Sequence, residues 1–477
     1  MKNISIWKDT VETRVYPKLD SDKSVDVLIV GGGITGVSAL YHLRNSNLNV
    51  MLVEQNRVGF SVTGSSTGKL NYLQNDLLDK IRKNFSDKVA SKYLQSQKTA
   101  IEMVTDIISK EKIDCDLEKV SANLYTNKDI EIEKLKDLKL FLEDNNISVF
   151  EDNSDLVHSK YMIKVEDTYL FHPIKFVYGL LKKNDFPIYE NTSVQKIEEE
   201  NDYYICYTDQ YKIKAKWVVL ASHYPYFVLP FLFPIKASLE KSYLSASKYG
   251  GKSVSLISYS NPFISIRNYK DYLIYLSNSH SVDSSVNDFH HFNELSKKIG
   301  DLDLEAEYLW SNIDVMTNDG LPYIGRMKGN ILIGTGYNTW GLANGVLAGS
   351  ILSDVILNRK NSFLELFSPT RMNASKIAGG IVDGIKSING YINGLLKKSS
   401  NIRYEVRDGK SVMIYYDGKK EYVVYQNCPH FGCKLLFNEV EKTWDCPCHG
   451  SRFDLSGKCI SGPSNKDITF IDGKDFN

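Results

Sequence analysis

The chain has 477 residues, of which 42% are hydrophobic and 24% are charged, and its formal net charge is zero. This length predicts roughly two to three domains with large cores. The neutral charge gives no electrostatic basis for binding nucleic acid or an anionic membrane. Residues 1–22 lack the apolar segment of a signal peptide, and the apolar run 331–357 is interrupted by Gly, Asn and Asp. We therefore expect a cytoplasmic location and no integral membrane segment.

The first predicted elements form a dinucleotide-binding unit. A strand rich in β-branched residues over 25–30 runs into Gly31-x-Gly33-x-x-Gly36, and a helix is expected from Ile34 to Arg44. Gly31 permits the tight turn, Gly33 lets a pyrophosphate approach the backbone, and Gly36 lets the helix pack closely on the strand. The free N–H groups at the start of this helix favour an anionic group there.

A second strand, residues 49–53, ends at Glu54, in the place where an acidic side chain binds a ribose hydroxyl. A glycine triplet alone can be only a turn. Strand, glycines, helix, strand and acid in this order predict a dinucleotide-binding fold. The loop 63–70 that follows is small and rich in hydroxyl groups, so it suits the second half of a long cofactor.

Two insertions interrupt this fold. Residues 75–160 have a helical pattern, since the run 100–108 repeats apolar positions at intervals of three and four. Residues 225–310 alternate as strands do, for example at 263–266 and 272–276.

A second glycine-rich unit comes later in the chain. The segment Asp319-Gly-Leu-Pro-Tyr-Ile-Gly325 precedes a short strand, 331–333, and glycines. The sequence Trp340-Gly341 then leads into a helix of small residues over 346–357.

These elements resemble the FAD-dependent oxidoreductases of the D-amino-acid oxidase and glycine oxidase superfamily. The strand 218–221 with the Ser-His-Tyr-Pro that follows it, and His172-Pro173 at a helix start, match the same superfamily. The resemblance implies an α/β FAD-binding Rossmann-like domain with a mixed β-sheet substrate domain. The FAD-binding residues that it implies are Gly31, Gly33, Ile34, Thr35, Gly36, Glu54, Thr67, Gly68, Lys69, Val194, Ala221, Gly336, Trp340, Gly341 and Leu342.

The sequence offers two candidate catalytic residues. Lys69 should reach the flavin, although a lysine of a solvated loop is an equally good interpretation. Arg267, in the strand Ile-Ser-Ile-Arg, is a candidate for binding a substrate carboxylate, with a surface ion pair as the alternative. We expect non-covalent FAD, because the usual anchoring positions lack His and Cys.

Near the C-terminus, two boxes read Cys428-Pro-His430-Phe-Gly-Cys433 and Cys446-Pro-Cys448-His449-Gly-Ser451. Each box supplies one thiolate and one imidazole plus an extra cysteine. A [2Fe–2S] centre with two thiolates on one iron and two imidazoles on the other needs that set. Zinc knuckles also use Cys and His, but they favour Cys-x2-Cys spacing and a single tetrahedral array.

The two boxes resemble the Rieske iron–sulfur domain, which implies an all-β domain. The cluster ligands are then Cys428, His430, Cys446 and His449. In the subgroup with extra cysteines these form a disulfide, here Cys433 with Cys448. Related domains place a hydroxyl at Ser451 beside a bridging sulfide, and high-potential relatives have Tyr where this chain has Phe453. The lost hydrogen bond predicts a modest reduction potential.

The whole chain is therefore expected to be an FAD-dependent oxidoreductase at 1–370, a Gly-interrupted helical connector at 371–399 and a Rieske domain at 400–477. Within the first part, FAD-binding segments are expected at about 23–75, 160–225 and 315–360, and substrate or cap segments at about 76–159 and 226–314.

Flavin handles two electrons and a Rieske cluster passes one at a time. The first hypothesis is a dehydrogenase that oxidises an amine- or amino-acid-like small molecule at FAD and sends electrons out through the cluster. The alternative is a reductase in which the cluster feeds the flavin. Either needs a soluble electron donor or acceptor. A Rieske oxygenase is a weaker interpretation, because it needs a mononuclear iron with two His and a carboxylate, and the remaining histidines offer no convincing set.

Overall fold

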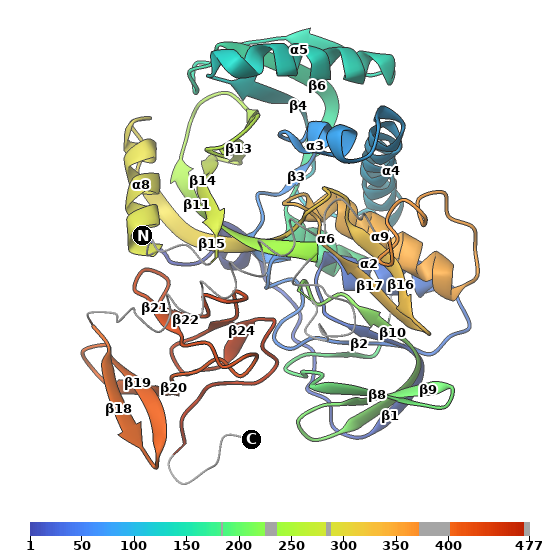
Figure 1. Cartoon of the computed structure of the whole chain (residues 1–477), viewed down its shortest axis with the longest axis vertical. Coiled ribbons are helices and arrows are strands. Elements are labelled where there is room, and N and C mark those ends of the chain that lie inside the picture. Colours follow the sequence, from blue (N-terminus) through green and yellow to red (C-terminus); the bar gives the residue numbers. More distant parts are fainter. Residues whose placement is uncertain (183–184, 225–235, 283–287, 372–400, 472–477) are drawn as a thin grey trace.

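The computed structural model describes residues 1–182, 185–224, 236–282, 288–371 and 401–471 (Figure 1). The connector expected at residues 371–399 lies outside the described residues, apart from residue 371. Within the described part of the chain, no helix is both long and apolar enough to span a membrane.

An eight-stranded sheet forms the base of the molecule, with strand order β16-β17-β10-β1-β2-β7 and the β8–β9 pair attached to β10. The central pairs β1–β10, β1–β2 and β10–β17 are parallel. Such strands are covered on both faces, which explains their near-continuous apolar sequences. The bounds are β1 Lys23–Val30, β2 Val50–Val53, β7 Ile188–Tyr189, β8 Lys196–Glu200, β9 Tyr203–Tyr207, β10 Lys212–Leu220, β16 Tyr323–Lys328 and β17 Ile331–Thr335.

Two helices, α2 (Ile34–Leu43) and α9 (Gly341–Ile356), pack against each other. Their approach depends on small residues: a Cβ on Gly349 would lie 2.5 Å from Ser38 Cβ, and one on Gly345 would lie 2.6 Å from Ile34 Cγ2. The small-residue helix expected late in the chain is therefore α9, and it begins beside the start of α2.

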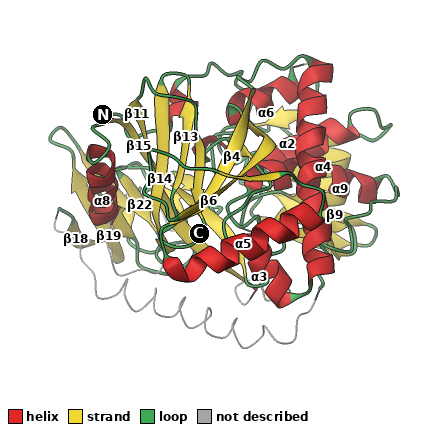
Figure 2. Cartoon of the chain, turned by 90° about the horizontal axis from the view of Figure 1, so that it is seen from above, coloured by secondary structure: helices red, strands yellow, loops and turns green. Residues whose placement is uncertain are grey.

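A nine-stranded mixed sheet lies over the first, in the order β15-β11-β14-β13-β12-β4-β6-β3, with β5 on β6. Figure 2 shows α2, α4 and α9 gathered at the opposite end of the molecule from α8 and the strands β18 and β19. The strands are β3 Lys69–Leu70, β4 Glu118–Thr126, β5 Val149–Glu151, β6 Tyr161–Leu170, β11 Ala237–Lys248, β12 Ser255–Ser258, β13 Ser265–Tyr269, β14 Tyr272–Ser281 and β15 Ala306–Thr317. The other helices are α1 Ile6–Asp9, η1 Thr63–Ser65, α3 Leu77–Asn84, α4 Asp87–Glu111, α5 Asp129–Asp144, α6 Pro173–Leu181 and α8 Asp288–Gly300.

The helical expectation for residues 75–160 is right for α3, α4 and α5 but wrong for β4 and β5. β4 pairs with β12 on one side and β6 on the other, so its state is set by partners distant in the sequence. β6 itself, expected within an FAD-binding segment, belongs to this same sheet. Propensity along one segment cannot reveal such pairing.

The C-terminal region is all-β, as expected, and packs beside the body of the protein (orange and red in Figure 1). A three-stranded sheet holds β18 (Arg403–Arg407), β19 (Lys410–Tyr416) and β20 (Glu421–Tyr425), and a four-stranded sheet holds β21 (Leu436–Asn438), β22 (Thr443–Asp445), β23 (Arg452–Phe453) and β24 (Cys459–Ser461). Its own core includes the fully buried Trp444, Phe453, Val424 and Leu435.

Candidate functional site

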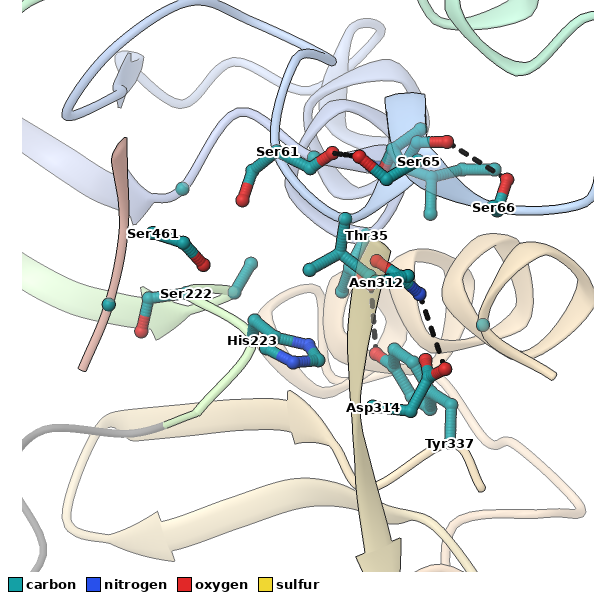
Figure 3. Close-up of a pocket in the computed structure, with 18 of the residues that line it drawn as sticks. Thr35, Ser61, Ser65, Ser66, Ser222, His223, Asn312, Asp314, Tyr337 and Ser461 are labelled. Atoms are coloured by element: carbon teal, nitrogen blue, oxygen red, sulfur yellow. Dashed lines mark hydrogen bonds between the residues drawn. The ribbon is translucent and has the colours of Figure 1, made fainter. Parts of the chain in front are cut away.

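A long cavity runs between the two large sheets, with an empty volume of about 1530 Å³, open solvent at its mouth included (Figure 3). Its walls come from the ends of β1, β2 and β10, the starts of α2 and α9, the loop 61–69, and strands β13 to β15. A crevice at the carboxyl ends of parallel strands is where open α/β sheets bind their ligands.

Glycines shape the end of this cavity at β1. Gly31 has φ +111°, and a Cβ there would lie 2.5 Å from the Ala221 carbonyl oxygen. A Cβ on Gly36 would lie only 1.9 Å from the carbonyl oxygen of Gly31. Gly33 is the N-cap of α2 and Trp340 that of α9, and neither N-cap residue caps its helix with its own side chain, although Ile34 N donates to Thr63 Oγ1 at 3.0 Å. Two helix N-termini therefore meet at the cavity, which suits pyrophosphate and other electron-rich groups.

Glu54 is buried in the wall at the end of β2. Its Oε2 accepts a hydrogen bond from Gly32 N at 2.7 Å and its Oε1 accepts one from Asn56 N at 2.8 Å. Burial raises the pKa of this carboxyl group, while the two backbone donors act against the increase. The acid is thus held rigidly beside the glycine turn.

Several buried polar atoms of the wall have no hydrogen-bond partner among the described residues. They are Asn56 Oδ1, His223 Nε2, Thr339 Oγ1 and Trp340 Nε1. Buried polar groups are nearly always paired, so this set fits a polar ligand that completes the pairing. FAD, with its adenosine, pyrophosphate and flavin parts, fits both this wall and the glycine turn.

The structure places most of the residues expected to bind FAD in the cavity wall: Gly31, Gly33, Ile34, Thr35, Glu54, Thr67, Lys69, Val194, Ala221, Trp340, Gly341 and Leu342. Gly36, Gly68 and Gly336 lie behind it and shape the backbone. Asn312, Asp314 and Ser461 also line it (Figure 3). No sequence motif marks them, because the strands that carry them are remote from the glycine motifs.

Lys69 lines the cavity and donates a hydrogen bond from Nζ to the Leu256 carbonyl at 2.9 Å. It is only 5% exposed, and burial, followed by the charge of Arg267, lowers its pKa far below the usual value. Burial therefore favours the uncharged form of the Lys69 amine.

Arg267 has a different place from the one expected. Its guanidinium is buried behind the loop, where Nη1 donates to the carbonyls of Thr67, Gly68 and Phe171 at 3.2, 2.6 and 3.3 Å. Its side chain does not line the cavity. The prediction that Arg267 binds a substrate carboxylate is replaced by a structural assignment, in which it clamps the loop that carries Lys69.

The two cysteine–histidine boxes fold into matching loops. In the first, Cys428 N donates to Cys433 O at 2.8 Å and Gly432 N to Cys428 O at 2.9 Å. In the second, Cys446 N donates to Ser451 O at 2.7 Å and Gly450 N to Cys446 O at 3.0 Å. The paired backbone pattern brings the side chains of the two loops to a common point.

At that point the two imidazoles face one another, with 5.0 Å between the ring centroids of His430 and His449. Both nitrogens of His430 and Nδ1 of His449 are buried without a partner among the described residues. Burial lowers the pKa of His430 to about 3 and that of His449 to about 4, so both rings are neutral, as metal ligands must be.

The thiols of Cys428 and Cys446 contact each other, and this contact lowers the pKa of Cys428. Two thiols and two neutral imidazoles thus converge in a buried site, which fits a [2Fe–2S] cluster. The expected disulfide between Cys433 and Cys448 is present and joins the loops, with 6.5 Å between the Cα atoms.

The hydrogen bonds around the sulfurs lead to a prediction about reduction potential. Ser451 Oγ accepts from Ser464 N at 2.9 Å, and its hydroxyl also bonds to the Cys428 sulfur. A donor near a ligand sulfur favours the more negative, reduced cluster. Ser451→Ala should therefore lower the potential by on the order of 60 mV, the equivalent of about 1.4 kcal/mol for one electron.

Phe453, fully buried in this domain, is the position at which a substitution should have the opposite effect on the reduction potential. Phe453→Tyr should raise the potential by restoring a donor to a ligand sulfur. Redox titration monitored by EPR measures both variants, and shifts of the same sign would show that these side chains are wrongly placed relative to the sulfurs.

The C-terminal domain, which carries the two cysteine–histidine loops, also contributes residues to the cavity wall. Ile460, Ser461, Gly462 and Ser464 of the C-terminal domain line the cavity together with the glycine turn. Asn56 Nδ2 donates to Cys459 O at 2.9 Å across this boundary. The rings of Tyr224 and His449 lie 6.2 Å apart, between centroids. His449 therefore lies beside Tyr224, the residue that follows the cavity-lining His223.

A buried ion-pair network holds the two domains together. Lys241 Nζ of β11 lies 2.8 Å from Asp445 Oδ2 and 2.6 Å from Asp288 Oδ1, and Arg452 Nη2 lies 2.7 Å from Glu441 Oε2. Burial acts to lower the pKa of Lys241, but the charges of Asp288 and Asp445 outweigh it and raise that pKa. Lys241 thus stays charged. Its partner Asp445 is the residue that directly precedes Cys446.

Lys241→Met should destabilise the protein by about 3–5 kcal/mol, because it leaves buried carboxylates without their cation. Lys248→Met is the matched control on the same strand, since Lys248 pairs with Asp271 at the exposed surface. We expect the control to keep the wild-type melting temperature and the Lys241 variant to lose several degrees in thermal unfolding. Equal melting temperatures for the two variants would contradict the structural role of the network.

Comparison with known proteins agrees with this geometry. Residues 26–355 match the family described as FAD dependent oxidoreductase, and residues 396–471 match the Rieske [2Fe-2S] domain. The chain is 27% identical to the iron–sulfur protein YhfW of Bacillus subtilis (strain 168), whose name describes it as a Rieske 2Fe-2S protein, over 98% of this chain and 97% of that one.

Two solved structures have the same fold in the first part of the chain. L-proline dehydrogenase from P. horikoshii has a TM-score of 0.62 at 15% identity, over 74% of this chain and 98% of its own. Glycine oxidase from Geobacillus kaustophilus has a TM-score of 0.61 at 18% identity, over 73% and 99%. The chain thus belongs to the FAD-dependent oxidoreductase family, and it carries a Rieske domain, so that its cofactors are FAD and a [2Fe–2S] cluster.

Proposed function

We propose that the protein oxidises an amine- or amino-acid-like substrate at FAD and that the cluster then removes the electrons one at a time for a soluble acceptor. The observation that carries this proposal is the junction, where four residues of the Rieske domain line the same cavity as the flavin-binding motif. FAD supplies two-electron chemistry when bound, and the cluster supplies one-electron transfer.

Different residues of the chain have separate roles in the proposed reaction. The starts of α2 and α9 would hold the cofactor through backbone N–H groups, and Glu54 fixes the glycine turn. Lys69, in the cavity wall and with its pKa lowered by burial, is the group proposed to take up or deliver a proton at Nζ. The Leu256 carbonyl orients that nitrogen.

Tyr224, which follows the cavity-lining His223, and His449, which would hold the cluster, mark the proposed path between the two cofactor sites. The 6.2 Å between the Tyr224 and His449 ring centroids, together with the burial of Tyr224, supports this direct route over one through solvent. The substrates named in the titles of the two similar structures, L-proline and glycine, both carry a C–N bond, which supports an amine-type substrate.

Anaerobic reduction tests the direction of electron flow. The holoenzyme is mixed with a panel of amines and amino acids, and flavin bleaching and the EPR signal of the reduced cluster are followed together. We expect bleaching by at least one amine-type compound, with the cluster signal appearing as the flavin loses electrons. Bleaching only by a reduced ferredoxin would instead support the reductase, in which electrons run from the cluster to the flavin.

A further inference from the structure

One carboxylate in the cavity has no assigned task. Asp314 lies on β15 and lines the cavity beside Asn312, whose Nδ2 donates to Asp314 Oδ2 at 3.2 Å (Figure 3). Side chains alternate along a strand, so the neighbours Ile313 and Val315 point the other way, into a hydrophobic core. The alternation places one polar pair of β15 in the cavity.

The negative charge of Asp314 is not compensated by a positively charged side chain among the described residues. Within the described part of the chain, no Lys or Arg forms an ion pair with its carboxylate. Its partner across the strand pair β11–β15 is Glu240, another acid. Burial, followed by the charge of Glu240, raises the pKa of Asp314 to about 7. A partly buried acid beside a second acid is unfavourable for folding, and perturbed groups of this kind concentrate at binding sites.

Among the described residues that line the cavity there is no Arg, and the Lys there, Lys69, has its Nζ bonded to a backbone carbonyl. Arg267 is turned toward backbone carbonyls, and Lys69 Nζ donates to the Leu256 carbonyl at 2.9 Å, while burial lowers the pKa of Lys69. The remaining wall near these strands includes the apolar side chains of Phe263, Leu276 and Trp340. This part of the cavity therefore combines one anion with an apolar surface.

We propose that Asp314, assisted by Asn312, binds the ammonium group of the substrate, and that the substrate is an alkylamine with no carboxylate on the carbon that bears the nitrogen. The inference rests on the proposed function, because it names the substrate class of the same site. The apolar wall receives the alkyl chain, and the Asn312 carbonyl oxygen is a second acceptor for the ammonium hydrogens.

Binding of three simple probes tests the proposal on the holoenzyme: n-butylammonium, butyrate and zwitterionic 2-aminobutyrate. Calorimetry and the perturbation of the flavin spectrum measure affinity at about pH 8.5, above the pKa of Asp314 and below that of an alkylammonium group. We expect butylammonium to bind more tightly than the other two. Asp314→Asn should weaken butylammonium roughly 10- to 100-fold, and Asp314→Arg should shift the preference to butyrate.

Glu240→Gln is the matched control, since it removes the neighbouring acid but keeps Asp314. It should leave butylammonium affinity unchanged or increase it. Asp314→Asn should retain both cofactors and a melting temperature at least equal to that of the wild type, because the amide avoids the cost of a buried charge. Such retention separates lost binding from lost folding.

Tighter binding of butyrate or 2-aminobutyrate by the wild type, no binding of butylammonium, or an unchanged affinity in Asp314→Asn would each overturn the proposal. A different result would refute the proposed function, and it does not depend on the binding probes. Photoreduction of the flavin needs no substrate, so electrons that never reach the cluster after photoreduction would refute the relay whatever the probes show.

Discussion

His449→Ala should abolish the EPR signal of the reduced cluster and release the iron, while FAD stays bound. His449 is one of two buried neutral imidazoles that converge on the cluster site, and no other histidine within the described residues replaces it there. Most of the FAD cavity wall belongs to the first part of the chain, so flavin binding should survive. Iron analysis, EPR and the flavin released on denaturation give the three measurements.

His158→Ala, in a partly exposed loop far from both sites in the sequence, is the control for replacing a histidine. It should keep iron, the EPR signal and FAD at wild-type amounts. Loss of FAD together with iron in the His449 variant would mean that the two domains fold as one unit. The FAD site and the cluster site would then not be independent, contrary to the proposal. If iron and signal both remained, the ligand assignment would be wrong.

Gly36→Ala should yield protein without FAD. The new Cβ would lie 1.9 Å from the Gly31 carbonyl oxygen, a backbone atom of the turn. That turn is itself held by the hydrogen bond from Gly31 N to Val53 O at 2.8 Å. Helix α2 must then move off β1, which takes its N-terminal N–H groups away from the pyrophosphate. Overpacking typically costs about 1–3 kcal/mol, and a backbone neighbour has little freedom to relax.

The ratio of flavin absorbance to protein absorbance measures this loss directly. Gly250→Ala is the control, because a Cβ at Gly250 meets nothing within 4 Å. We expect the control to bind FAD in full and the Gly36 variant to bind almost none. Full flavin content in Gly36→Ala would mean that close packing of α2 on the glycine turn is not required for the cofactor.

Local motifs were the predictable part of this protein. The four cluster ligands lie in two short boxes, and the glycine turn, helix and acid are contiguous, so each can be seen without knowing the sheet order. Asp314 was not predictable, because its place depends on the alternation of β15 and on the pairing of that strand with β11. Arg267 was misinterpreted for a related reason. A strand arginine looks available in the sequence, and only the packed structure shows its donors taken by the carbonyls of a distant loop.

The way residues 460–464 close the cavity has a consequence for the biogenesis of the protein. The strands β1, β10 and β17, which lie side by side, come from early, middle and late parts of the chain, so the FAD site is complete only after α9 has been synthesised. The Rieske domain follows and adds the last wall. We therefore expect an order of maturation, in which FAD enters first and the docking of the cluster domain then traps it. Holoenzyme should exchange FAD with solution far more slowly than a chain whose cluster domain has not yet docked.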